Sequence, residues 1–222
     1  MTLPKITMSE LLPSLYHAQF KGQRAMCSTF MRFQEYYESP NERFRGHYFT
    51  KQEYAAWYAQ QRGQFSYYED WGGFNIPDYI IKDFAAGKFD PLSGREKNLL
   101  NTLIAFRPNL FAKPFYLIGT CGREEDIAHE VAHGLWYLSK SYRQQMESLL
   151  ASFSTSFKSR FLKALGEGGY CQEVLLDELQ AYIITDGRDY WFSEQGLSLK
   201  RYCSTVESME QLFAAHYSEP QS

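Results

Sequence analysis

Two histidines one helical turn apart are the residues of this sequence whose types and spacing best suit chemistry. His129 and His133 enclose Glu130 in the segment GREEDIAHEVAHGLWYL, which has the pattern H-E-x-x-H. Residues four apart on a helix lie on the same face about one turn apart, so both imidazoles can direct a nitrogen at one metal ion. The pattern therefore predicts a metal site, and imidazole ligands in a tetrahedral arrangement favour Zn²⁺.

Glu130 follows His129 directly, so on a helix its carboxylate lies beside the predicted metal rather than on it. From that position it can take a proton from a metal-bound water, whose pKa the ion lowers, and pass it to a leaving amine. We therefore predict that Glu130 is a general base. The alternative is that His129 and His133 are polar residues of a solvated helix face or core histidines with neighbouring partners. The apolar flanks of the segment favour burial, where an unpaired polar group costs a few kcal/mol.

A catalytic zinc normally has three protein ligands and leaves one position for water. No other histidine follows His133 closely, because the remaining three are His17, His47 and His216. A downstream carboxylate is therefore the better candidate. The segment CQEVLLDELQAYIITD predicts a helix over 172–186 and offers Glu173, Asp177 and Glu178.

A helical projection distinguishes these carboxylates. With Val174 at 0°, Glu178 lies at about 40°, inside the apolar sector, whereas Asp177 lies at about 300°, near Gln180 on the polar side. An ionised carboxylate among apolar neighbours needs a compensating cation, so Glu178 is the predicted third ligand. The alternative is a Glu178 that extends to solvent or pairs with a buried arginine.

These two segments resemble the motifs of the gluzincin type of zincin metallopeptidase. His129, Glu130 and His133 match the first motif, and the run from Asp177 to Tyr182 (DELQAY) resembles the D/N-E-x-x-A/S element of the second helix. The resemblance covers roughly residues 115–186. It implies Zn²⁺ bound by the two histidines and Glu178, a zincin-like α+β fold, and an extended peptide substrate bound by β-augmentation along a strand just upstream of the active helix.

An acyl-transfer site also needs a donor for the oxyanion of the tetrahedral intermediate. We predict Tyr182 for this role, one turn beyond Glu178, with Tyr170 as the other candidate. The alternative is that both belong to the core, because the chain has 17 tyrosines. A serine or cysteine nucleophile is not favoured, since the sequence has no G-x-S-x-G and no cysteine signature near the histidines.

The predicted fold class is α+β and mostly helical, with a small sheet preceding the active-site helix. At 222 residues the chain suits one domain over 1–222, with a mostly helical part over 1–110, a zinc-binding core over 111–190 and a C-terminal helical segment over 191–222. The best strand is PFYLIGT, residues 114–120. Residues 64–79 predict an ordered aromatic loop, with a helix possible from Pro77. Apolar spacing and capping signals predict helices over 24–38, 51–62, 93–104, 123–139, 142–165, 172–186 and 205–216.

Charge and composition exclude several classes of partner. The net charge is -3, and neither sign forms a run that would follow a phosphate backbone, so we expect no nucleic acid. No stretch approaches the roughly 18 apolar residues that span a bilayer, and the N-terminus lacks the apolar core of a signal peptide. The four cysteines form no C-x-x-C. We therefore expect a soluble protein that is cytoplasmic or exported without a cleaved signal peptide.

Together these features predict a zinc-dependent metallopeptidase that acts on peptide or protein substrates. Two alternatives remain open at this stage. One is a metal-binding or protein-interaction module without turnover, although such a site has no use for Glu130. The other is a zinc hydrolase of a different amide or ester, because a site fixes the reaction type and not the substrate.

Overall fold

The computed structural model describes residues 3–122, 124–168, 170–185 and 196–217. The chain forms two compact units, Met1–Ile127 and Ala128–Ser222. The boundary between them falls inside helix α6 (Glu124–Leu138). That the chain folds as one domain, with an internal division near residue 110, stays a prediction.

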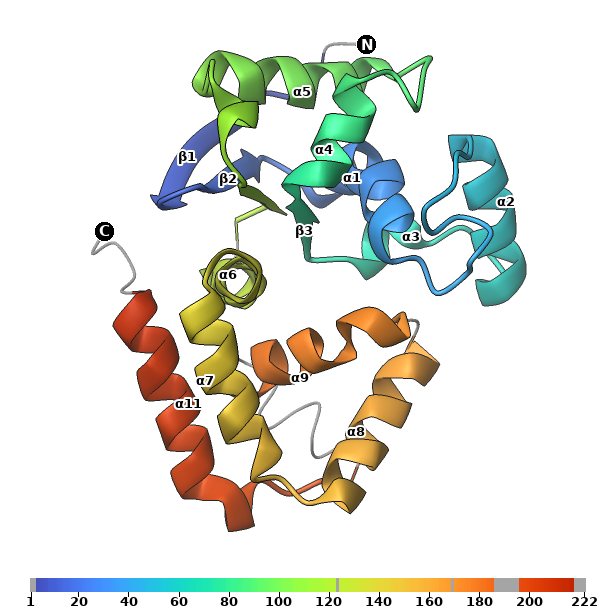
Figure 1. Ribbon diagram of the computed structural model, residues 1–222. Coiled ribbons are helices and arrows are strands. Elements are labelled where there is room, and N and C mark those ends of the chain that lie inside the picture. The colour runs from blue at the N-terminus through green and yellow to red at the C-terminus, as the bar shows by residue number, and fades with distance from the viewer. Residues whose placement is uncertain (1–2, 123, 169, 186–195, 218–222) are drawn as a thin grey trace. The chain divides into compact units, whose positions relative to one another are not determined.

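The first unit contains a four-stranded sheet in the order β1-β2-β4-β3 (Figure 1). β1 (Ile6–Leu12) and β2 (Leu15–Phe20) form an antiparallel hairpin, and β2 runs parallel to β4 (Tyr116–Thr120). β3 (Gly73–Pro77) pairs antiparallel with the other side of β4. β4 confirms the strand predicted over 114–120, and every one of its residues is buried.

The central place of β4 contradicts one implication of the gluzincin resemblance. An extended peptide was expected to add to this strand, yet residues Tyr116–Thr120 pair with β2 on one side and with β3 on the other. Strand addition needs backbone N–H and C=O groups that no neighbouring strand uses. β-Augmentation along β4 is therefore wrong, because both of its edges are already occupied.

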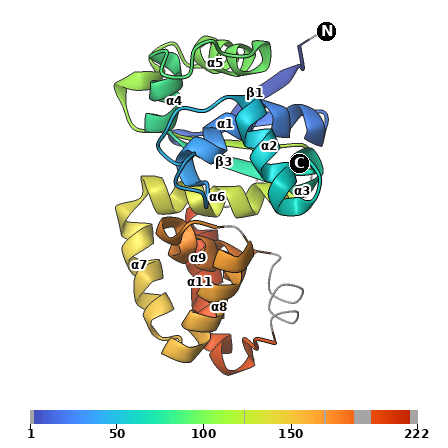
Figure 2. The same ribbon diagram turned by 90° about the vertical axis from the view of Figure 1, so that its right-hand side faces the viewer.

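Helices cover this sheet and bury a core rich in aromatic rings. α1 packs against β2, β3 and β4, and α5 packs against β1 (Figure 2). Phe30 of α1 stacks on Phe74 of β3 with ring centroids 5.3 Å apart. The helices of this unit are α1 (Gln23–Glu38), α2 (Lys51–Arg62), α3 (Tyr67–Asp70), α4 (Asp78–Ala85), α5 (Gly94–Phe106) and the 3-10 turn η1 (Leu110–Ala112).

Local capping signals correctly predicted α2 and α5 in this unit, whereas α3 lies in the segment predicted as a loop. Thr50 with Glu53 and Ser93 with Glu96 form the expected capping boxes, and Gly63 ends α2 in the left-handed conformation at φ 79°. Three strands were missed. β3 lies within the segment predicted as a loop and contains Gly, Asn and Pro, residues with low strand propensity that are held here by pairing with β4.

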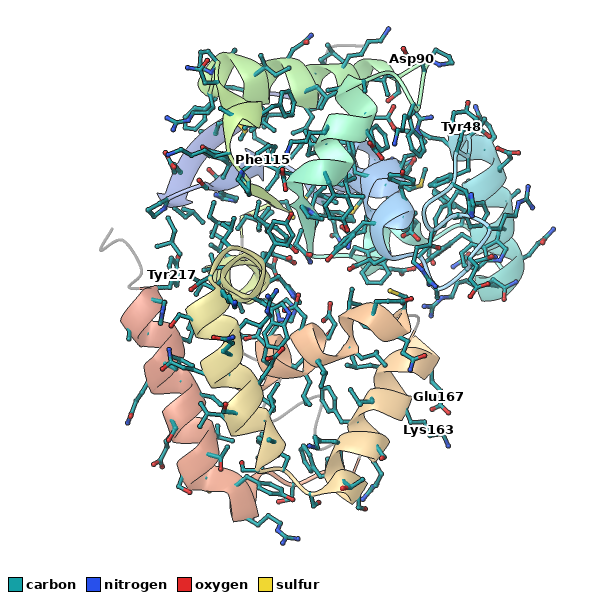
Figure 3. All side chains as sticks on the ribbon, in the orientation of Figure 1. Tyr48, Asp90, Phe115, Lys163, Glu167 and Tyr217 are labelled. Carbon is teal, nitrogen blue, oxygen red and sulfur yellow. The ribbon has the colours of Figure 1, made fainter. Side chains whose placement is uncertain are left out.

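All the secondary structure of the second unit, among its described residues, consists of helices and 3-10 turns. α11 packs against α7 and α9, and α8 packs against α9 (Figure 1). α8 buries Phe161 and Leu165, whereas Lys163 and Glu167 project from its outer face, 3.7 Å apart (Figure 3). Besides α6 from Ala128 onward, the elements are α7 (Lys140–Ala151), α8 (Thr155–Gly168), η2 (Gln172–Val174), α9 (Leu175–Ile184), η4 (Lys200–Tyr202) and α11 (Cys203–His216).

The single helix predicted over 142–165 is wrong, because α7 ends at Ala151 and a separate helix, α8, begins at Thr155. Ser152 donates its hydroxyl to the carbonyl of Leu149 at 2.7 Å, and Ser154 accepts from the backbone N–H of Phe157 at 3.2 Å. Serine hydroxyls that bond nearby backbone groups compete with the helix and favour its ends. Ser154 is also bound to the hydroxyl of Tyr202 at 2.9 Å, which fixes the corner against η4.

α9 is buried on more sides than a surface helix, which corrects the projection made from sequence. Asp177 and Gln180 were expected on a polar face, but both are buried, whereas Leu176 is 45% exposed. The reason is that neighbouring helices cover the side of α9 that sequence assigned to solvent, and the two polar residues bond within that interface. The first three residues of the predicted helix form the 3-10 turn η2, and residue 186 lies outside the described residues.

The coarse prediction of a mostly helical α+β protein with a small sheet is confirmed. Among the residues that the structure describes, every helix is too short or too polar to cross a bilayer.

A buried carboxyl in the first unit makes stability depend on pH. Glu35 in α1 is 5% exposed, and burial raises its pKa from the ordinary 4.5 to about 7, although the hydroxyls of Tyr54, Tyr67 and Ser39 partly offset the rise. The folded state therefore holds this proton more tightly than the unfolded state. The stabilisation is fully present below pH 4.5 and is lost as the pH rises through about 7.

Glu35→Gln cannot lose a proton, so we expect it to gain stability relative to the wild type as the pH rises from 4.5 to 8. The shift to about 7 corresponds to roughly 3 kcal/mol in the difference between their free energies of unfolding. Denaturant titrations at several pH values measure this difference. Glu42→Gln, at an exposed position, is the control and should show no such trend. A difference for Glu35→Gln that is constant with pH would contradict the buried neutral carboxyl.

Candidate metal centre

The structure brings together the side chains of His129, His133 and Glu178, all in the second unit. Nε2 of His129 lies 3.3 Å from Nε2 of His133. The two carboxylate oxygens of Glu178 lie 3.6 Å from His133 Nε2 and 3.8 Å from His129 Nε2. α6 supplies the histidines and α9 the glutamate, so one donor atom from each residue points to a common centre.

These separations suit a tetrahedral metal ion. Ligand atoms at about 2.0–2.1 Å from such an ion are separated from one another by about 3.3 Å. The 3.3 Å between the two Nε2 atoms matches that value. The Glu178 carboxylate approaches through both of its oxygens, one 3.6 Å from His133 Nε2 and the other 3.8 Å from His129 Nε2, so it lies near the position of a third ligand. In addition, Oε2 of Glu178 is buried and has no hydrogen-bond partner among the described residues. A carboxylate oxygen in this position suits a cation, so the residues present fit a metal ion.

Asp177 is not one of the three candidate ligands, but it pairs with one of them, His133. Its Oδ1 lies 3.0 Å from Nδ1 of His133, on the opposite side of the imidazole from Glu178. The hydroxyl of Tyr142 donates to Gln180 at 2.9 Å, and the Gln180 amide donates to the same Asp177 oxygen at 3.0 Å. Tyr142 and Gln180 are fully buried. This chain of hydrogen bonds fixes the orientation of His133 from α7 and α9 together.

Thr185 supports the other histidine. Its hydroxyl oxygen lies 3.2 Å from Nδ1 of His129, at the end of α9. Thr185 was not among the site residues predicted from sequence, although it lies seven residues after Glu178. On a helix that spacing places both residues on the same face, and this was the available signal.

Negative charge gathers around the two imidazoles. Burial opposes a charged His133, but the carboxylates of Asp177, Glu178 and Glu130 outweigh it and raise the pKa of His133 well above its usual value. Glu130 is 6% exposed and also acts electrostatically on Tyr182. Glu130 thus acts electrostatically on both His133 and Tyr182, and the charge balance of the region favours a cation.

Tyr182 and Tyr170 lie beside this cluster. The ring of Tyr182 meets that of His129 edge to face, with centroids 4.9 Å apart, and its hydroxyl lies 2.8 Å from the hydroxyl of Tyr170. Burial raises the pKa of Tyr182, so its hydroxyl stays protonated at neutral pH. The Tyr182 side chain therefore contacts one of the candidate metal ligands, and its role as an oxyanion donor stays a prediction.

The other candidates from sequence lie elsewhere. Glu173 is exposed on η2. His17 belongs to the first unit, where its Nε2 lies 2.9 Å from the hydroxyl of Thr120. His216 bonds the carbonyl of Leu212 through Nδ1 at 2.9 Å, within α11. None of them is part of the cluster that could hold a metal ion.

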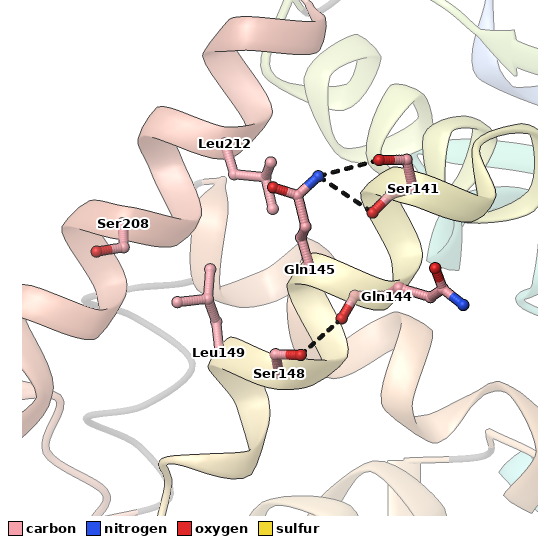
Figure 4. A pocket seen from close by; sticks show the side chains of 7 residues that line it. All are labelled: Ser141, Gln144, Gln145, Ser148, Leu149, Ser208 and Leu212. Carbon is pink, nitrogen blue, oxygen red and sulfur yellow. Dashed lines mark hydrogen bonds between the residues drawn. The ribbon is translucent and has the colours of Figure 1, made fainter.

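A separate groove lies between α7 and α11 and has a volume of about 600 Å³ (Figure 4). Hydroxyl, amide and leucine side chains line it: Ser141, Gln144, Gln145, Ser148, Leu149, Ser208 and Leu212. None of these lining residues is titratable or a good metal ligand, so the groove offers no acid, base or metal chemistry. The histidine and glutamate cluster is therefore the better candidate for a functional site.

Comparisons of the chain with protein-family models, with curated proteins and with solved structures found no match. The case for a function therefore depends on the chemistry of His129, His133, Glu178 and Glu130.

Proposed function

We propose that this protein is a zinc-dependent hydrolase that cleaves peptide bonds, with Zn²⁺ held by His129, His133 and Glu178. The observation that carries the proposal is the convergence of these three donor atoms. The buried Glu130, next to His129 in the sequence, adds negative charge that acts on His133. Two imidazoles and one carboxylate suit Zn²⁺ better than Mg²⁺ or Ca²⁺, which prefer shells made of oxygen. The proposal includes a zincin-like arrangement of α6 and α9.

In this proposal each residue has a distinct task. His129, His133 and Glu178 would hold the ion, which when bound would supply a lowered pKa for a water molecule and polarisation of a substrate carbonyl. Glu130 accepts a proton from the attacking water and delivers it to the leaving amine. Asp177 orients the imidazole of His133 through its Nδ1 atom, and Thr185 orients that of His129 in the same way.

The tyrosine pair supplies a donor for the developing oxyanion. When two hydroxyls share one hydrogen bond, the accepting hydroxyl keeps its own hydrogen for another partner. If Tyr182 accepts from Tyr170, its own hydrogen would be the donor to a substrate oxygen bound beside His129, on which the Tyr182 ring packs. The raised pKa of Tyr182 supports this role, because a donor must stay protonated.

The first prediction is that the purified protein contains close to one zinc ion per chain. Elemental analysis after purification with added zinc measures the content, and dialysis against a chelator should remove the metal together with any peptide hydrolysis. A content far below one per chain would contradict the metal site and the function that depends on it.

The second prediction concerns the third ligand. Glu178→Ala should lower zinc affinity by orders of magnitude, because it removes a donor atom at the centre. Asp177→Ala should lower it by at most about 10 to 100-fold, the range typical of a residue that supports a ligand. Zinc titrations of the two variants compare adjacent residues of one helix. The reverse order of effects would assign the ligand to Asp177.

The third prediction tests the base. Glu130→Gln should abolish hydrolysis of a peptide mixture while zinc content and melting temperature stay nearly unchanged, because Glu130 is proposed as a base and not as a ligand. The matched control is His129→Ala, which should lose both zinc and activity. Full activity in Glu130→Gln would refute the role of the base. Zinc binding without cleavage of any peptide by the wild type would favour a module without turnover or a different amide or ester substrate.

A further inference from the structure

The hydroxyl group of Thr185 is engaged in two directions. It donates to the carbonyl of Ala181 at 2.7 Å, and its oxygen lies 3.2 Å from Nδ1 of His129. A hydroxyl has one hydrogen and two lone pairs. Because the hydrogen points to Ala181, the oxygen faces His129 as an acceptor. A hydrogen bond between them therefore requires the hydrogen on Nδ1.

The position of this hydrogen decides which atom of His129 can bind a metal. A neutral imidazole carries one hydrogen, so an Nδ1–H form leaves the lone pair on Nε2. Nε2 is the atom that lies 3.3 Å from His133 Nε2 and 3.8 Å from Glu178 Oε2. The ring of Tyr182, packed edge to face on His129 with an interplanar angle of 66°, restrains the imidazole in this orientation.

We propose that Thr185 is a positioning residue that fixes His129 in the Nδ1–H tautomer and so makes Nε2 its metal ligand. This inference rests on the proposed metal site and adds to it the residue that sets the tautomer of one of its ligands, His129. Glu178 and Tyr182 lie four residues apart on α9, and Thr185 is the residue that caps the C-terminal end of this helix, so one helix and its cap supply the third ligand, the packing ring and the acceptor.

A neutral acceptor is well suited to this position. The region already contains the carboxylates of Glu130, Asp177 and Glu178, all of them buried. Another buried carboxylate behind His129 would add to the desolvation penalty and to the repulsion between like charges. A threonine oxygen selects the same tautomer without adding negative charge. The two histidines are thus oriented by acceptors of different kinds, a carboxylate for His133 and a hydroxyl for His129.

Nuclear magnetic resonance of the metal-free protein tests the tautomer directly. With ¹⁵N-labelled histidine, and at a pH raised until each imidazole carries a single proton, long-range ¹H–¹⁵N correlations distinguish a protonated from an unprotonated ring nitrogen. We expect the wild type to show Nδ1 of His129 protonated and Nε2 unprotonated. Thr185→Ser, which keeps the oxygen, should show the same pattern, whereas Thr185→Val should shift His129 toward the Nε2–H tautomer.

Zinc titrations provide the second measurement. Thr185→Val should lower zinc affinity by about 10 to 100-fold, and Thr185→Ser should restore it to within a few-fold of the wild type. Thr205→Val is the matched control, since Thr205 lies on α11 and its hydroxyl contacts Ser152 instead. This control should leave both the tautomer and the affinity unchanged.

The result that would overturn the inference is an Nε2–H tautomer of His129 in the wild type, whatever the fate of the valine variant. An unchanged tautomer in a folded Thr185→Val protein would also overturn it. These outcomes are separate from failure of the proposed function, because they are measured without metal and without substrate. A protein that shows the Nδ1–H tautomer and binds zinc but cleaves no peptide retains this inference and loses the hydrolase proposal.

Discussion

The burial of acidic side chains next to two imidazoles is the constraint on which the second unit depends. Glu130, His133, Asp177 and Glu178 are each less than a tenth exposed. An isolated carboxylate in such surroundings would be strongly destabilising, and it persists only with hydrogen bonds, a neighbouring cation or both. The helices of this unit pack so that Asp177 pairs with His133, whereas Oε2 of Glu178 has no hydrogen-bond partner among the described residues. The charge that remains favours a bound cation.

The supporting hydrogen bonds explain why α9 is buried on so many sides. Tyr142 on α7 bonds Gln180, and Gln180 bonds Asp177, which in turn holds His133 on α6. Each donor or acceptor would be costly to leave unpaired at this depth, so the three helices have little freedom to shift relative to one another. Precise orientation of the imidazoles is a consequence of this network and not of the two histidines alone.

The first unit has a different physical basis. Its sheet is held by backbone pairing on both sides of β4, and its core is a set of closely packed aromatic rings. A Cβ atom at Gly119 of β4 would lie 2.4 Å from the ring of Phe30, so glycine is required there for α1 to approach the sheet. Because β4 is paired on both edges, an extended peptide cannot add to this strand as the gluzincin resemblance implied.

The sequence by itself determined the features that depend on neighbours within one or two helical turns. The His129, Glu130 and His133 spacing, the capping boxes at Thr50 and Ser93, and strand β4 are of this kind. The tertiary structure decided the rest. It paired β1, β2 and β3 despite weak local signals, and it buried Asp177 and Gln180 on a side of α9 assigned to solvent. It also brought Thr185 to His129, 56 residues away in sequence. Such contacts join residues far apart along the chain, so no local pattern of residues encodes them.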